Sequence, residues 1–137
     1  CIVARKDAKL SAGALSIADN TCYCSVSASS MDGKSIENSS KLLIFHITDV
    51  VNSNMEFNNP SRTEMKKTGT LPYLARVGSV KAKIKSNVPN MKLYALNSAG
   101  ERIRRVPCKY SAEEGAYMFK LAVSTEEEAS MIYELSK

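Results

Sequence analysis

Apolar and polar residues alternate with a period of two along most of this chain. In residues 80–85, Val80, Ala82 and Ile84 alternate with three lysines. Successive side chains of a β-strand point to opposite faces of its sheet, so this pattern predicts strands with one face on a core and one face in water. The same alternation marks residues 22–30, 117–123 and 129–135.

Turn residues separate these segments at regular intervals. Asp32-Gly33 follows one predicted strand, residues 98–101 should close a hairpin, and residues 113–115 precede another strand. Short strands at this spacing predict an all-β fold, an antiparallel β-sandwich of immunoglobulin-like or jelly-roll-like type, forming a single domain over residues 1–137. The one expected helical turn begins at Ser124 or Thr125, ahead of three glutamates.

Residues 41–51 are apolar on both faces, which distinguishes this segment from the other predicted strands. This pattern predicts a central strand that is covered on both sides, or a strand covered by something outside the chain. The asparagine-rich residues 52–59 that follow should form an ordered loop, with Met55 and Phe57 anchoring it against the sheet. One predicted face carries Leu43, Phe45 and Ile47, and the other carries Leu42, Ile44, His46 and Thr48.

The composition fits one domain with a real core, because 44% of the 137 residues are hydrophobic. The apolar runs are too short to cross a membrane, and no membrane partner is expected. Cys22 and Cys24 are predicted to lie on the same face of a strand, where they cannot form a disulfide with each other. We therefore expect the cysteines to be free thiols. The alternative is a disulfide between Cys108 and a cysteine of a neighbouring strand.

The net charge of +5 permits an acidic partner. A nucleic-acid partner is not expected, because sheet surfaces that bind nucleic acids interleave basic side chains with exposed aromatic rings, and only Tyr94 and Tyr110 lie near. A protein-interaction domain with a basic sheet face is therefore one alternative function. The residues that could form this face are Lys81, Lys83, Lys85, Arg102, Arg104, Arg105 and Lys109.

No motif in the sequence predicts catalysis. His46 is the only histidine, and it lies in an apolar strand with no second metal ligand at a recognised spacing, so we expect it to be packed and hydrogen-bonded within the sheet. An enzyme would require His46 in an open pocket beside a carboxylate such as Asp49. The glutamate clusters lie in turns, and no phosphate-binding loop is present. We therefore expect no catalytic residue, no metal site and no cofactor.

Aromatic rings are the usual platforms for sugars, and this chain has tyrosines but no tryptophan. Several tyrosines fall at core-facing positions of the predicted strands. Tyr73, in the expected loop that includes residues 69–76, is the best single candidate. The predicted carbohydrate-binding residues are Tyr73, Arg76 and Tyr94.

The order of short motifs resembles the C-terminal β-sandwich accessory domain of bacterial glycoside hydrolases and glycoside hydrolase-like proteins. The similarity begins near residues 7–13 and continues through an Asp-Gly-Lys turn at residues 32–34. It includes an Asp-Asn-Asn-Met-Phe pattern and a Gly-x-x-Pro segment. The residues that carry these last motifs are Asp49, Asn52, Asn54, Met55, Phe57, Gly69 and Pro72, and a hairpin at residues 95–102 follows.

The resemblance implies a non-catalytic accessory domain, cut from a longer multidomain chain, that packs on a catalytic (β/α)8 barrel of the same polypeptide. It also implies a bacterial protein at the cell surface or outside the cell, and a contribution to binding a polysaccharide. An independent carbohydrate-binding module is the alternative within this interpretation. No catalytic residue of such enzymes has a counterpart in this chain.

Overall fold

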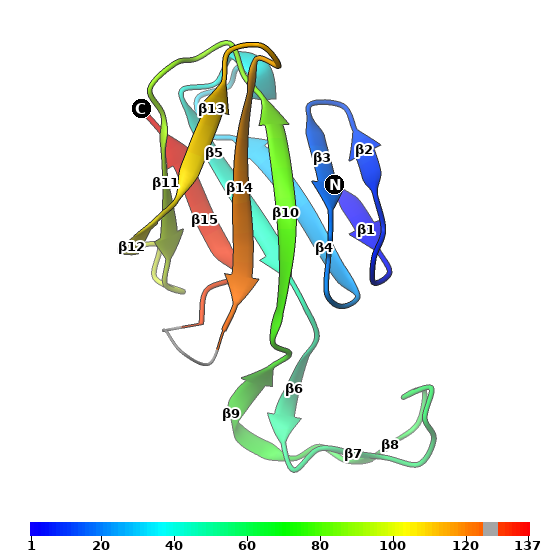
Figure 1. Ribbon diagram of the computed structural model, residues 1–137. Coiled ribbons are helices and arrows are strands. Elements are labelled where there is room, and N and C mark those ends of the chain that lie inside the picture. The colour runs from blue at the N-terminus through cyan, green and yellow to red at the C-terminus, as the bar shows by residue number, and fades with distance from the viewer. Residues whose placement is uncertain (125–128) are drawn as a thin grey trace.

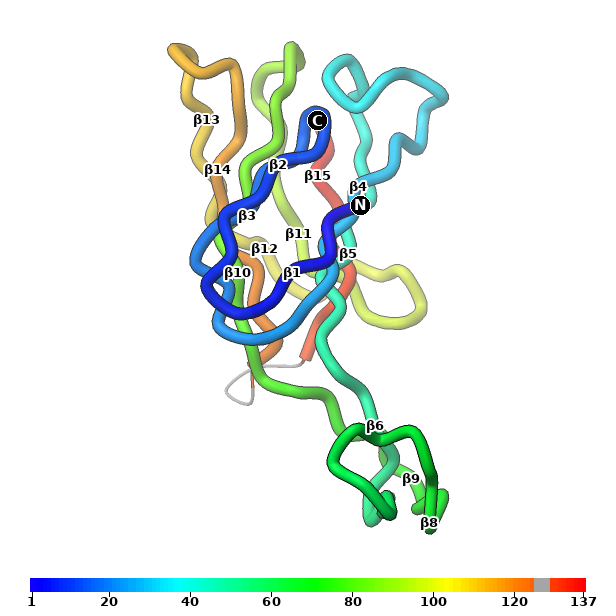
Figure 2. Tube along the Cα trace, turned by 90° about the vertical axis from the view of Figure 1, so that its right-hand side faces the viewer, coloured from blue at the N-terminus to red at the C-terminus, as the bar shows by residue number. Residues whose placement is uncertain are grey.

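The computed structural model describes residues 1–124 and 129–137. Over these residues the protein is almost entirely β-structure, folded as a sandwich of antiparallel sheets, which confirms the predicted fold class (Figure 1). A narrow arm built from two short ribbons projects from one end of the sandwich, as two perpendicular views show (Figures 1 and 2).

The two sheets of the sandwich have six and five strands. In spatial order, the six-stranded sheet contains β1 (Ile2–Ala4), β4 (Cys24–Ser30), β5 (Lys41–Ile47), β15 (Ile132–Ser136), β11 (Lys92–Leu96) and β12 (Arg102–Val106). The five-stranded sheet contains β13 (Cys108–Ser111), β14 (Ala116–Val123), β10 (Gly78–Lys85), β3 (Leu15–Ala18) and β2 (Leu10–Ala12).

The core lies between the two sheets and is formed by the apolar half of each alternating pattern. On β10, Val80, Ala82 and Ile84 are buried, while the lysines between them point to solvent or are partly covered. On β14, β15 and β4 the predicted inward residues within the strands are likewise buried, except Ala28, which is half-buried. The predicted faces of these strands are therefore confirmed, although Cys22 lies just before β4 rather than in it. Ala129 and Met131, predicted to share the inward face of Tyr133 and Leu135, lie before β15, where Ala129 is exposed and Met131 half-buried.

Between β12 and β13 the chain passes from the six-stranded sheet to the five-stranded sheet at Pro107. The predicted hairpin closed by residues 98–101 forms between β11 and β12, but the second strand predicted over residues 102–110 is divided, and β13 follows directly in the other sheet. Proline has no N–H to donate to a sheet, so it suits the break between the two strands. The buried Tyr117 joins the connection after β10 to the core, since its hydroxyl donates to Val88 O at 2.8 Å and accepts from Met91 N at 3.0 Å.

The segment of residues 41–51 is not one strand, contrary to the prediction. β5 ends at Ile47, and the chain leaves the sandwich through Thr48 and Asp49 to begin the arm. Leu42, Ile44 and His46 form the core-facing side, and the other side is only partly covered, with Ile47 39% exposed. The predicted second apolar face therefore exists as a half-buried strip on the outside of the six-stranded sheet.

The arm comprises β6 (Val50–Ser53) paired with β9 (Thr70–Ala75), and β7 (Glu56–Phe57) paired with β8 (Met65–Lys67). It replaces the predicted loops at residues 52–59 and around Tyr73, which lies in β9. Met55 and Phe57 do not anchor a loop against the sandwich, because they belong to the projecting arm (Figure 1). The segment pairs as strands, with a shift of register in each of the two ribbons, which agrees with the prediction that it is ordered.

Among the residues that the structure describes, helical structure is limited to one 3-10 turn, Ile36–Asn38, which the sequence did not predict. The helical turn expected from Ser124 onward falls largely on residues 125–128, outside the described residues. Within the described part of the chain, no helix is long and apolar enough to span a membrane. All four cysteines are free thiols, so the disulfide left open for Cys108 does not form.

His46 is fully buried on the core side of β5, as predicted for a structural residue. Its backbone N–H donates to Met131 O at 2.8 Å, but neither ring nitrogen has a hydrogen-bond partner among the described residues. The expected side-chain hydrogen bond is therefore wrong. Burial disfavours the charged imidazolium and lowers the pKa of His46 to about 4.

This burial makes the fold sensitive to mild acid. Between pH 6.5 and about 4 the unfolded chain binds a proton at His46 that the folded chain does not. As the pH is lowered through this range, the free energy of unfolding should therefore decrease, by at most about 1.4 kcal/mol per pH unit. Urea unfolding at pH 7.5, 6.0 and 5.0 should show this loss in the native protein and a much flatter profile in His46→Leu. Parallel pH profiles for the two proteins would contradict the assignment.

Candidate binding surfaces

The structure does not bring the three predicted carbohydrate-binding residues together. Tyr73 lies on β9 of the arm and is 68% exposed, whereas Arg76 lies where the arm joins the sandwich. Tyr94 lies on β11, in the six-stranded sheet, opposite Glu134 of β15 and Arg105 of β12. These positions define separate surfaces: the arm, its junction with the sandwich, and the outside of the larger sheet.

Tyr94 belongs to a polar cluster that covers its ring. The guanidinium carbon of Arg102 lies 4.2 Å from the ring centroid, in a cation–π contact. Arg102 also forms an ion pair with Glu134, donating from Nε to Oε1 at 3.0 Å, and Lys41 Nζ lies 3.3 Å from the other carboxylate oxygen. Because Arg102 covers one face of the Tyr94 ring, that face is not free for a ligand to stack on, contrary to the prediction that Tyr94 is a binding residue.

Glu134 is nearly buried although it lies on the outer face of the sheet. Burial alone would raise its pKa, but bonds from Arg102, Ser136 and Lys41 hold the pKa of Glu134 below its usual value. The carboxylate is thus a charged structural link between β15, β12 and β5. Sequence reasoning missed this residue because its partners come from distant strands.

The arm exposes apolar side chains on both of its faces. All six residues of β9 are exposed, including Leu71 at 70% and Tyr73, and Met65 of β8 is also exposed. In the register of the ribbon, Val51 stands opposite Leu74 and Val50 opposite Ala75. Neighbouring side chains of a strand point to opposite faces, so neither face of this ribbon is a covered core.

Polar contacts and one glycine define the conformation of the arm. Asn52 Nδ2 donates to Thr68 O at 3.0 Å, and Ser53 Oγ donates to Pro72 O at 2.7 Å. Gly69 has a φ of +80°, and a Cβ there would lie 2.4 Å from Ser53 O, so only glycine fits. Local bonds of this kind can order the arm without burying its apolar surface.

At the junction of arm and sandwich, a hollow of about 740 Å³ combines an exposed ring with charged groups. Tyr23 is 62% exposed and lines it together with Val3 and Ile47. Arg62 and Arg76 line the same hollow.

Asp49 links the two arginines of the junction hollow. Its Oδ2 accepts from Arg62 Nη1 at 2.5 Å and from Arg76 Nη2 at 3.2 Å. Partial burial would raise the pKa of Asp49, but the two arginines hold it below its usual value. At the same place, Thr48 Oγ1 donates to Arg76 O at 2.7 Å, which ties the two chain segments of the arm together.

Only part of the predicted basic face forms. Lys81, Lys83, Lys85 and Lys109 belong to strands of the five-stranded sheet, but Arg102 lies on the outside of the other sheet with Glu134. Arg104 and Arg105 line a hollow of about 400 Å³ that Lys120 also borders. Lys120 was not among the predicted basic residues. Its position opposite Lys81 in the register of β14 and β10 places it on the outer face of the five-stranded sheet.

The described residues offer no obvious catalytic group. His46 is 0% exposed, so the open pocket that an enzyme based on it would need is absent. Burial raises the pKa of Cys24, and it raises the pKa of Cys108 to about 11, so both thiols are protonated and weakly nucleophilic near neutral pH. Within residues 1–124 and 129–137, no three acidic, histidine or cysteine side chains gather as metal ligands.

The Glu134 cluster should contribute measurably to stability. Glu134→Ala leaves Arg102 and Ser136 without their carboxylate partner and should lower the free energy of unfolding by about 2 kcal/mol. Glu114→Ala, which removes an exposed partner of Lys83, should cost at most about 1 kcal/mol. Urea unfolding of both variants at pH 7.5 makes the comparison, and equal losses would contradict the structural role of Glu134.

Comparisons with protein-family models, with curated proteins and with solved structures each gave no match. The surfaces described above are therefore the basis for a functional proposal.

Proposed function

We propose that this protein is a non-catalytic accessory domain that packs against a neighbouring folded domain through its arm. The observation that carries the proposal is the exposure of β9 on both faces, including Leu71, Tyr73 and Leu74. The partner we propose is a catalytic domain of the same polypeptide, as the resemblance to accessory sandwiches of glycoside hydrolases implies.

The energetics of the arm support a docking role. A two-stranded ribbon is at best marginally stable by itself in water, because it has no second layer to bury its apolar side chains. Full burial of an exposed Leu side chain contributes roughly 1.5–3 kcal/mol of hydrophobic stabilisation. Covering Leu71 and Leu74, which are 70% and 51% exposed, would contribute a part of that each. A partner that covers the arm would therefore gain affinity from side chains that the sandwich leaves in water.

Exposed apolar side chains also lie on the sandwich near the point where the arm begins. Ile47, at the end of β5, and Val3, on the edge strand β1, are exposed at the junction. The exposed apolar side chains of the arm itself gather within one ribbon, and such groupings mark interaction sites more often than scattered single residues do. A neighbouring domain seated at this end could contact both the arm and the edge of the larger sheet.

Binding in trans would test the docking role. The catalytic domain of the same polypeptide, produced separately, should bind this chain in isothermal titration. A variant with Leu71→Ser and Leu74→Ser should bind at least tenfold more weakly, because two exposed leucines no longer become buried. Its free energy of unfolding should stay within about 0.5 kcal/mol of the native value, because both side chains are exposed.

Met31→Ser is the matched control, since Met31 is similarly exposed but lies between β4 and β5, outside the arm. It should bind like the native chain. A polypeptide without a folded neighbour for this chain, or a neighbour that binds the arm variant and the native chain equally, would contradict the proposal.

We propose carbohydrate binding at the junction hollow as a second function, because Tyr23 and Arg76 meet there. An exposed ring beside planar charged groups can stack on a sugar and bond to its hydroxyls. Arg76 was predicted from sequence, whereas Tyr23 was passed over. The same resemblance supports our proposal that the protein acts at the bacterial cell surface or outside the cell.

Affinity electrophoresis in gels that contain soluble polysaccharides tests this second function. At least one polysaccharide should retard the native chain, Tyr23→Ala should abolish the retardation, and Tyr73→Ala should leave it unchanged. Loss of retardation with Tyr73→Ala alone would move the site to the arm and overturn the assignment to the hollow. The absence of retardation by every polysaccharide would contradict carbohydrate binding altogether.

A further inference from the structure

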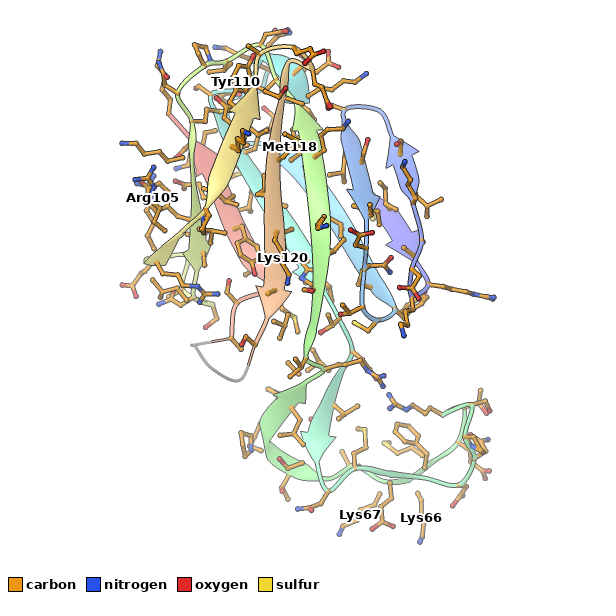
Figure 3. All side chains as sticks on the ribbon, viewed as in Figure 1. Lys66, Lys67, Arg105, Tyr110, Met118 and Lys120 are labelled. Carbon is orange, nitrogen blue, oxygen red and sulfur yellow. The ribbon has the colours of Figure 1, made fainter. Side chains whose placement is uncertain are left out.

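The outer face of the five-stranded sheet carries an array of lysines that the proposed docking role does not use. Lys81, Lys83 and Lys85 alternate along β10, and Lys120 lies on the neighbouring β14. The register sets Lys81 directly opposite Lys120, and Met118 opposite Lys83. Met118 and Lys120 lie along β14, on the face of the sandwich turned toward the viewer in Figure 3.

Lys81, Lys83 and Lys120 line a shallow hollow of about 490 Å³, and Lys85 lies further along β10, outside its lining. Lys9 also lines it, while Ala18 and Met118 contribute apolar surface. Such a site combines positive charge with an apolar floor. No aromatic ring on the outer face borders the hollow, since Phe119, the one aromatic residue in its lining, belongs to the core.

Carboxylates already pair with two of these lysines. Lys81 Nζ lies 2.7 Å from Asp19, and Lys83 Nζ lies 2.7 Å from Glu114. Lys120 has no ion pair among the described residues. It stands directly opposite Lys81, and two like charges in this position of an antiparallel pair destabilise a sheet. Additional carboxylates at this face would relieve that repulsion.

We propose that this face binds an extended acidic peptide segment. Alternate residues of a strand lie about 6.8 Å apart, and alternate residues of an extended peptide have the same spacing. Carboxylates at every second position of the peptide would therefore follow the lysines of β10, pairing with Lys85 directly and replacing Asp19 and Glu114 as partners of Lys81 and Lys83. Lys120, beside Lys81, adds a positive charge that has no ion pair among the described residues. Nucleic acids are less suited to the site, because the outer face offers no exposed ring there for base stacking.

The site goes beyond the docking role proposed for the arm, and it lies on a different sheet. Binding at the lysine face does not require the arm, so each proposal can fail without the other. A variant that loses the acidic peptide and still binds the neighbouring domain would separate the two.

Fluorescence anisotropy with two labelled eight-residue peptides provides the test. One peptide alternates glutamate and threonine, and the other has four glutamates followed by four threonines, so their charge is equal. The alternating peptide should bind several-fold more tightly, and its affinity should fall steeply as salt rises. Lys120→Glu should weaken it about tenfold, because a charge at the centre of the array is reversed.

Lys67→Glu is the control, since it makes the same charge change on the arm, far from β14 in Figure 3. It should leave the affinity for the peptide unchanged. Equal affinity for the two peptides, equal weakening by both substitutions, or no binding of either peptide would overturn the proposal. Tighter binding of polygalacturonate or single-stranded RNA than of the alternating peptide would also overturn it, in favour of another polyanion.

Discussion

Burial of one apolar face from each of two sheets is the interaction on which the whole structure depends. Each strand of the sandwich presents alternate residues inward, and the two inner faces exclude water only by packing on each other. Fully buried side chains such as Ile44 from one sheet and Ile84 from the other form this common core. Everything outside it, including the arm, depends on the sandwich for its position.

The arm departs from this constraint. It begins where β5 of one sheet ends and returns to β10 of the other, so both of its ends are attached to the core. Local hydrogen bonds and a glycine define its shape, while its apolar side chains stay in water. The exposed apolar side chains of this ordered element are the observation that supports the docking role we propose.

Sequence periodicity predicted the sandwich well because a period of two identifies both strands and their inner faces. It could not predict which strands pair, since pairing depends on contacts between distant segments. The arm was missed for this reason: Val50 and Val51 continue the apolar pattern of β5, and only the pairing with β9 shows that they belong elsewhere. The unpartnered imidazole of His46 is a similar case, because its surroundings come from several strands.

The candidate sites show the same division between local and long-range information. Tyr94 looked available in sequence, but Arg102 on the neighbouring strand covers one face of its ring. Tyr23 and Arg76 are far apart in sequence, yet they line one hollow. Lys120 joins the lysines of β10 only through the register of two antiparallel strands. In each case the sequence shows which residue is present. It does not show which neighbouring side chains surround that residue in the fold, and these neighbours decide whether it is available to a ligand.

We claim that the core between the two sheets stabilises the sandwich, and that the arm has no core of its own. Amide hydrogen exchange of the isolated chain is the most direct test of this claim. The account predicts that amides of β5, β10 and β14 exchange only on global unfolding, and that arm amides from β6 to β9 exchange orders of magnitude faster. Arm amides protected as strongly as those of the sandwich would contradict the account, because the arm would then have stability of its own.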